Sequence, residues 1–401
     1  MLCMLTLLVV LVTVVLLTKP VGAAQGEAEE RALEYVDEHQ EEILAQWQEL
    51  VQIPGPSGQE EARARWVQQE MKEIGLDGVH IDGKGNVIGV LPGSDHGPNI
   101  VFSAHMDTVF PMDTELSISV KDGWLHVPGA ADDTAAVVAM LHGARAIKSS
   151  GVSLKANLIF LASVQEETGL AGAKYFLDHT SRPIDMFVAV DGTLGQVVCG
   201  ALGIQWWTIT YEVEAAHTLA SRGKPNAAVA LSQLIQRLYQ IQLPEKPLTV
   251  LNVGTIGGGT ATNAVCAEAK LTVDLRSQCP RELNNLVNQV LGQAYLTAAE
   301  CEAKVTLECA NAIEAGMIED ADKHILTQIA MGTLRDLGIE PELSTLGATD
   351  ANPAITRGIP GIAIGVVKGR RVHSLEEAAK ISSLYPGVKQ LILLALRLGN
   401  I

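Results

Sequence analysis

The chain has 401 residues, with 29 Lys and Arg against 46 Asp and Glu, which gives a formal net charge of −17 at pH 7. Hydrophobic residues make up 47% and charged residues 19% of the chain, and this balance excludes a disordered protein. The acidic excess argues against nucleic-acid binding, which needs Lys and Arg against the phosphates. The length predicts two or three domains.

The N-terminus carries the one long apolar run, LTLLVVLVTVVLLT over residues 5–18, followed by small residues. The length of the run and the small residues that follow it favour a signal peptide over residues 1–23, removed from an exported protein that is secreted or periplasmic. No positive charge precedes the run, so a retained membrane anchor is the alternative, and it is the only route by which we expect contact with a membrane.

Apolar runs alternate with helical patterns along the next part of the chain. Helix-favouring segments at 25–50 and 60–74 are separated by the breaker QIPGPSG. Buried strands are predicted at 100–104, 156–163, 186–190 and 362–367, with helices at 134–148 and 170–178 between the first three. This order predicts an α/β fold with a mixed, mainly parallel sheet flanked by helices.

The pattern changes after residue 200. Strand, helix, strand, strand, helix and strand follow one another over 206–308, an order typical of a ferredoxin-like α+β unit. We therefore predict a main domain formed by residues 24–204 and 311–401, interrupted by an inserted domain of residues 205–310.

Imidazole and carboxylate groups follow the predicted strands. In open α/β sheets, ligands bind beyond the carboxyl ends of the strands, so these side chains are expected along one edge. They are His105 and Asp107 after the first strand, Asp132 at the start of a helix, Glu166 and Glu167 after the second strand, Asp191 after the third, and His373 beyond the last.

So many carboxylates cannot be buried together as bare charges. Imidazole plus carboxylate suits zinc first, with manganese or cobalt as alternatives. Two such cations sharing a ligand can activate a water molecule, and a carboxylate that is not a ligand can take its proton. The adjacent Glu166 and Glu167 allow this division of labour, because neighbouring side chains of an extended segment point in different directions.

At this point the chain resembles the M20 family of di-zinc metallopeptidases, which includes aminoacylase, carboxypeptidase G2 and peptidase T-like enzymes. The matching segments are SAHMDTV, PGAADDTAAVVAML, SVQEETGLAGAKY, VAVDGT and VHSLEEA, together with AAHTLASRGKPNAAVAL and LNVGTIGGGTATNAV in the insert. The resemblance implies a zinc-exopeptidase type of sheet and two divalent metal ions per chain.

The resemblance also implies roles for individual residues. His105 and Asp191 would hold one metal, Glu167 and His373 the other, and Asp132 would bridge them, with Asp133 behind the ligands. Glu166 would be the general base. Asp107 would hydrogen-bond the other nitrogen of His105 and so fix its orientation.

The insert of such enzymes serves as a lid and as the surface of a homodimer. His217 would stabilise the oxyanion, often from the partner subunit, and Asn263 and Arg276 would contact substrate. Each has a simpler interpretation: His217 as a packing residue, Asn263 as a turn former, and Arg276 as the partner of a nearby acidic group, Asp274 or Glu268.

The predicted function is hydrolysis of an amide bond in small peptides by an exopeptidase similar to di- and tripeptidases. Deacylation of N-acyl amino acids is the alternative enzymatic function. From another class, an inactive binding protein on the same fold is the third hypothesis, and the presence of all the ligand residues and Glu166 argues against it.

Overall fold

The computed structural model describes residues 21–94 and 96–401. The apolar run at 5–18 lies outside these residues, so the signal peptide or anchor stays a prediction. In the described part of the chain, no helix combines the length and the apolar character needed to cross a membrane.

The main domain is built on an eight-stranded sheet whose order is β1-β2-β6-β3-β7-β16-β8-β15. The four neighbours at its centre, β6, β3, β7 and β16, are parallel, whereas β2 and β8 pair antiparallel with them. The predicted mixed, mainly parallel sheet is thus confirmed. Its strands are β1 (Asp77–Ile81), β2 (Val87–Leu91), β3 (Asn99–His105), β6 (Asn157–Ser163), β7 (Met186–Leu194), β8 (Gln196–Val198), β15 (Glu342–Ser344) and β16 (Gly361–Gly365).

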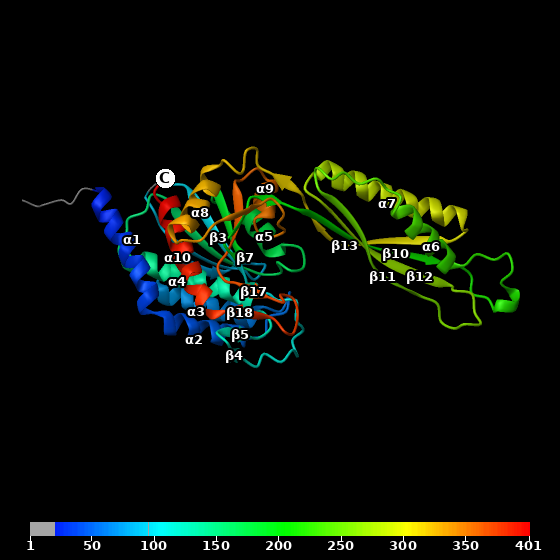
Figure 1. Ribbon diagram of the computed structural model, residues 1–401, viewed down its shortest axis with the longest axis horizontal. Coiled ribbons are helices and arrows are strands. Elements are labelled where there is room, and N and C mark those ends of the chain that lie inside the picture. The colour runs from blue at the N-terminus through cyan, green and yellow to red at the C-terminus, as the bar shows by residue number, and fades with distance from the viewer. Residues whose placement is uncertain (1–20, 95) are drawn as a thin grey trace, which may run out of the picture.

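Helices cover both faces of this sheet (Figure 1). On one face, α4 is buried along most of its length, which explains why most of its residues are apolar. The other face is covered by two short helices. The first face has α1 (Val21–Glu38), α2 (Gln40–Val51), α3 (Glu61–Ile74), α4 (Ala135–Ser150), α8 (Ile325–Asp336) and α10 (Ile381–Leu398), and the second has α5 (Ala171–His179) and α9 (Asn352–Thr356).

The central strands are buried on both faces, and every residue of β3 is buried. Such strands carry continuous apolar runs rather than alternating patterns. Phe102 of β3 and Phe160 of β6 are paired in register, with their ring centroids 6.1 Å apart. The packing of these rings fixes the two strands whose carboxyl ends carry the first predicted site residues.

The insert is a four-stranded antiparallel sheet of order β11-β12-β10-β13 with two helices packed on one face. This is the ferredoxin-like arrangement that the sequence predicts, and Figure 1 shows it extending from one side of the main domain. The unit spans Gly203 to Ile313, and its independence as a domain at 205–310 stays a prediction. Its elements are β10 (Gly203–Glu212), η2 (Thr218–Ala220), α6 (Ala227–Leu238), β11 (Thr249–Gly258), β12 (Glu268–Ser277), α7 (Pro280–Glu300) and β13 (Lys304–Ile313).

Two small sheets complete the fold. One lies beside the irregular turn η1 (Ala130–Thr134) and supports the loop that carries His373; its order is β17-β18-β5-β4. The other pairs segments on either side of the insert. Their strands are β4 (Ser119–Lys121), β5 (Trp124–His126), β17 (Gly369–Arg370), β18 (Ala378–Lys380), β9 (Gly200–Ala201) and β14 (Gly316–Met317).

Candidate metal centre

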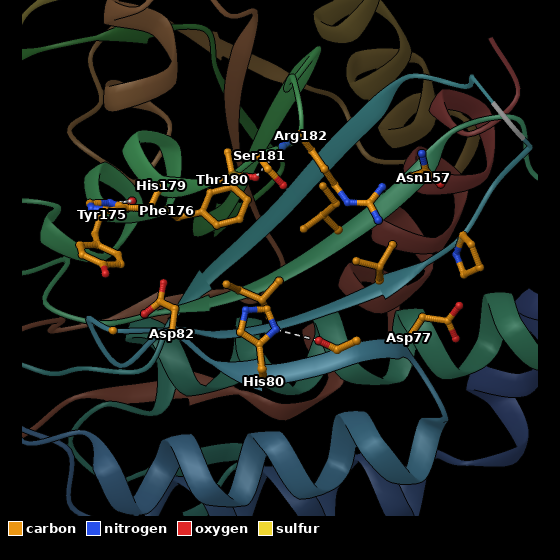
Figure 2. Close-up of a pocket in the computed structure, with 16 residues that line it drawn as sticks. Asp77, His80, Asp82, Asn157, Tyr175, Phe176, His179, Thr180, Ser181 and Arg182 are labelled. Atoms are coloured by element: carbon orange, nitrogen blue, oxygen red, sulfur yellow. Dashed lines mark hydrogen bonds between the residues drawn. The ribbon is translucent and has the colours of Figure 1, made fainter.

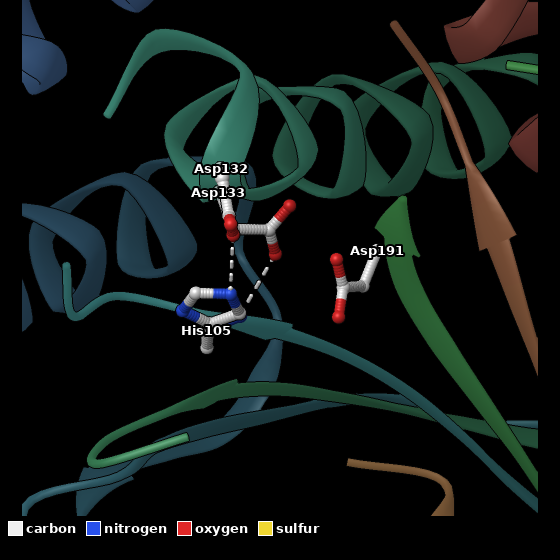
Figure 3. Close-up of side chains that lie close together, drawn as sticks. All are labelled: His105, Asp132, Asp133 and Asp191. Atoms are coloured by element: carbon white, nitrogen blue, oxygen red, sulfur yellow. Dashed lines mark hydrogen bonds and ion pairs between the residues drawn. The ribbon is translucent and has the colours of Figure 1, made fainter. Parts of the chain in front are cut away.

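Two groups of metal-ligating side chains meet beyond the carboxyl ends of the central strands. In the first, the candidate ligand atoms of His105, Asp132, Asp133 and Asp191 all lie within 4.8 Å of one another. Figure 3 shows His105 at the end of β3, Asp191 on β7, and the two aspartates at the start of the α4 segment. The second group is Asp132, Glu167 and His373.

Asp132 belongs to both groups and divides its oxygens between them. Its Oδ1 lies 2.9 Å from Nε2 of His105, and its Oδ2 lies 2.9 Å from Nε2 of His373. Nε2 of His373 is also 3.0 Å from Oε1 of Glu167. A carboxylate between two imidazole-containing groups is the arrangement expected of a ligand shared by two cations.

The donor set fits two divalent cations. Imidazole nitrogens and carboxylate oxygens are the ligands that zinc, manganese and cobalt accept. All five residues predicted as ligands are present in the two groups. Asp133 joins the first group as well, but its Oδ2 accepts a hydrogen bond from the backbone N–H of His105 at 3.1 Å.

Burial and mutual repulsion perturb these carboxylates. Burial, with the negative charge of Asp132, raises the pKa of Asp191 to about 7. Burial also acts to raise the pKa of Asp132, but hydrogen bonds from His105 and His373 outweigh it and lower that pKa. The hydrogen bonds of His373 to Asp132 and Glu167 raise its own pKa to about 10. The site thus concentrates negative charge that a cation would offset.

Glu166 lies beside these groups without belonging to either. Only 7% of the residue is exposed, and burial, reinforced by the charges of Asp191 and Asp350, raises the pKa of its carboxyl well above the usual range. A carboxyl group with a raised pKa next to a metal centre can accept a proton and later return it. The assignment of Glu166 as the general base stays a prediction.

Asp107 is fully buried and organises the site through its backbone and side chain. Its carbonyl oxygen lies 3.1 Å and its Oδ1 3.4 Å from Nδ1 of His105. Its carboxylate also accepts the backbone N–H groups of Glu166 and Glu167, at 2.9 and 3.2 Å. Besides facing His105 as predicted, Asp107 therefore fixes the segment that carries the two glutamates.

A buried cation, Arg63, lies beneath this arrangement and is not among the residues predicted from the sequence. The side chain of Arg63 donates to the carbonyl of Ile53 at 2.8 Å and to that of Met106 at 2.6 Å, and the residue is 1% exposed. Nearby, Oε1 of Glu60 accepts the backbone N–H of Gln165 at 3.0 Å. The sequence could have indicated the burial of Arg63, because this residue lies on the same face of α3 as the buried Val67 and Met71.

Another buried carboxylate, Asp350, links three segments behind the site. Its Oδ2 accepts hydrogen bonds from the hydroxyls of Ser103 on β3 and Ser163 on β6, and the residue is 3% exposed. It lies in the stretch GATDAN, residues 347–352, outside the predicted site residues. Its charge contributes to the raised pKa of Glu166.

The three predicted substrate-contacting residues lie on the insert. His217 and Asn263 are exposed and adjacent to one another, since Thr218 N–H bonds the Asn263 carbonyl at 3.0 Å. Both lie past the end of β10 and β12 that is remote from the main domain, and the nine residue steps of β10 span about 30 Å. The structure does not bring them to the metal centre within one chain.

Arg276 lies at the other end of β12, near the main domain, and is paired with Asp274 on the same face of the strand. Its Nη2 is 2.9 Å from Oδ2 of Asp274, and its Nε is 3.0 Å from the same oxygen. The structure therefore has the ion pair that was the simpler interpretation of this residue.

A cavity of about 460 Å³ lies away from the metal centre, between α5 and the strands β1, β2 and β6 (Figure 2). Its lining includes the apolar side chains of Ile88, Ile159 and Phe176 and the polar side chains of His80 and Arg182. None of its lining residues is a predicted site residue, so this cavity is separate from the predicted metal site.

Comparisons with known proteins agree with this site. The model of peptidase family M20/M25/M40 matches residues 101–397. The chain is 26% identical over 361 residues to YqjE, an uncharacterised protein of Bacillus subtilis, covering 86% of this chain and 95% of that protein. The solved structure of a tripeptidase from Staphylococcus aureus is similar with a TM-score of 0.77 and 26% identity, covering 90% of this chain and 98% of the other.

A further solved structure has the same fold at lower identity. It is the YXEP protein of Bacillus subtilis, described as a dinuclear metal-binding M20 peptidase, with a TM-score of 0.68 and 16% identity over 90% of this chain and 99% of the other. The family match spans most of the chain, and the two ligand groups sharing Asp132 fit a pair of divalent metals. The chain therefore belongs to peptidase family M20/M25/M40 and is a metal-dependent hydrolase of peptide or amide bonds.

Proposed function

We propose that the protein is an exopeptidase that hydrolyses small peptides, with two zinc ions as the working metals and manganese or cobalt as substitutes. The observation that carries the proposal is the position of Asp132, whose two oxygens face His105 and His373 while Glu166 stays outside both ligand groups. The likeness to a tripeptidase at 26% identity supports a peptide substrate.

In the proposed mechanism, His105 and Asp191 would hold one metal, Glu167 and His373 would hold the other, and Asp132 would be shared between them. The metals, when bound, supply positive charge that polarises the substrate carbonyl and acidifies the attacking water. Glu166 accepts the proton of that water and delivers it to the nitrogen of the departing amine. Asp107 holds His105 and the Glu166–Glu167 backbone in position for these steps.

We further propose that the insert closes over the substrate and forms a homodimer. His217 lies about 30 Å along the insert from the main domain, so a partner subunit is the natural source of an oxyanion-stabilising imidazole. Asn263 would accompany it, because the two residues are adjacent. Arg276 would exchange Asp274 for a substrate carboxylate, to which its guanidinium can bond with two parallel N–H groups.

The N-terminal 23 residues bear on where this reaction takes place. We propose export by a cleaved signal peptide, with anchoring by the run at 5–18 as the alternative. The mass of the mature protein distinguishes the two: removal of residues 1–23 shortens the chain, whereas an anchored protein keeps them and partitions with membranes.

A hydrolysis screen tests the proposed function. The metal-reconstituted protein is assayed on dipeptides, tripeptides and N-acyl amino acids, and then on the best substrate with its amino or carboxyl terminus blocked. The proposal predicts cleavage of the free peptides and loss of activity when one terminus is blocked. Cleavage confined to N-acyl amino acids supports the deacylase alternative, and no cleavage of any substrate contradicts both.

A further inference from the structure

We propose that Glu377 is a positioning residue. It holds the shared ligand Asp132 and the loop of His373 in the relative position that binding of the second metal, the one assigned to Glu167 and His373, requires. The inference rests on the proposed function of the centre, and it concerns a residue that none of the predicted roles includes.

The carboxylate of Glu377 contacts the backbone of the turn that carries Asp132. The residue is fully buried, and its Oε1 accepts the N–H of Ala131 at 2.8 Å and that of Asp132 at 3.2 Å. The backbone of η1 leaves the helical conformation at Asp132, where φ is −126° and ψ is 96°. Donors in such a turn lack regular helical acceptors, and Glu377 supplies one for both.

Glu377 itself is fixed by sheet structure. Its neighbour Ala378 begins β18 and pairs with His126 of β5 and with Arg370 of β17. The segment between β17 and β18 carries His373, and the N–H of Glu377 bonds the carbonyl of Ser374 at 3.0 Å within it. The same short segment therefore presents one metal ligand and holds the backbone of another.

The two segments approach each other closely next to this contact. A Cβ added to Gly369 of β17 would lie 2.7 Å from the Cβ of Ala131, so only glycine allows β17 to pack this near to η1. The two segments therefore pack directly against each other beside the hydrogen bonds that Glu377 accepts. Glu377 joins the segments of Asp132 and His373 at this point and so supports the 2.9 Å approach of Asp132 to His373.

Both hydrogen bonds go to one oxygen of Glu377, so a glutamine variant can test whether they carry its role. Oε2 is buried and has no hydrogen-bond partner in the described part of the chain. Glutamine at this position would keep an oxygen that can accept both N–H groups, whereas alanine would leave both donors unpaired. If acceptance of these two hydrogen bonds is the role of Glu377, glutamine must restore it and alanine must not.

The experiment measures binding of the second Co²⁺ ion to metal-free protein, followed by the visible absorption of the cobalt centre. It compares wild type with Glu377→Ala, Glu377→Gln and Glu376→Ala. Glu376 is the matched control because it is the adjacent glutamate, is exposed and pairs with Arg371 rather than with η1. Loss of a group that orients metal ligands weakens binding by about 10- to 100-fold.

We expect Glu377→Ala to weaken the second Co²⁺ site by that factor, and Glu377→Gln and Glu376→Ala to stay within about threefold of wild type. Equal cobalt affinity in wild type and Glu377→Ala, even with a lower melting temperature, overturns the inference. So does a Glu377→Gln variant whose second Co²⁺ site is weakened by the same factor relative to wild type, a comparison that remains available if the alanine variant does not fold. The titration needs no substrate, so a wild type that binds two Co²⁺ ions but hydrolyses nothing refutes the proposed function alone.

Discussion

Replacing Arg63 by methionine tests whether the buried cation supports the site from below. Methionine fills a similar space but removes the donors to the carbonyls of Ile53 and Met106 and the positive charge that faces Glu60 and Asp107. Burial already lowers the pKa of Arg63 to about 10, which shows how strongly the protein has desolvated this guanidinium.

The size of the effect follows from these contacts. Removing one member of a buried charged network costs about 3–5 kcal/mol, because the remaining charges lose their compensation. Each carbonyl left without a donor accounts for about 1–3 kcal/mol. At 2–4 °C for each kcal/mol, the melting temperature of the main domain should fall by about 6 to 20 °C.

The assay is thermal and urea unfolding of the metal-loaded protein, followed by tryptophan fluorescence, to which the fully buried Trp47 contributes. Arg65→Met is the matched control, because Arg65 lies two residues away on the same helix and is exposed. We expect Arg65→Met to remain within about 0.5 kcal/mol of wild type. A loss below about 1 kcal/mol in Arg63→Met would refute the reasoning about the buried network.

Three further results are expected. Burial lowers the pKa of His142 to about 3. Below pH 6.5 the unfolded chain therefore binds a proton at this residue that the native state does not bind. The free energy of unfolding should fall by up to about 1.4 kcal/mol per pH unit from pH 6.5 downward. Urea unfolding at pH 7.5 and pH 5 checks this, and the Tyr35→Phe, His142→Leu double variant, which removes the bonded pair, should lose less stability between the two values. Phe160→Ala should cost about 3–5 kcal/mol in urea unfolding, and a cost under 1 kcal/mol would contradict the packing of β3 against β6. Chelation should abolish hydrolysis and lower the melting temperature, with recovery on addition of Zn²⁺, and an unchanged melting temperature after verified metal loss would be inconsistent with the centre.

The central strands could be predicted because their burial on both faces produces uninterrupted apolar runs. The runs at 100–104, 156–163 and 186–190 lie within or close to β3, β6 and β7, and their following residues carry the site. The insert was also recognisable, since its helices and long strands have clear periods. Strands of two or three residues, such as β17 and β18, are too short to show any period, so the small sheet behind His373 was missed.

Helix limits were predicted less well where local chemistry departs from the pattern. The segment at 25–50 forms two helices that break at His39 rather than one. The terminal helix α10 begins at Ile381 and continues through Pro386, a residue type that usually ends a helix, so its start is hard to place from the sequence.

The supporting residues of the site could not be predicted because their partners are far away in the sequence. Glu377 bonds the backbone at Asp132 across 245 positions, and Asp350 bonds Ser103 across 247. From the sequence alone, charged residues with such distant partners cannot be told from residues of an exposed surface. The ligands themselves were recognisable because each of them follows a structural signal of its own.

The most direct test of the central claim compares two adjacent glutamates. Glu166 is assigned to proton transfer and Glu167 to metal binding, so Glu166→Gln should retain two metals per chain while kcat falls by at least about 10²- to 10⁴-fold. Glu167→Gln should weaken the binding of one metal. Normal kcat in Glu166→Gln, measured with the metal content of each variant, would contradict the assignment of Glu166 as the general base of this centre.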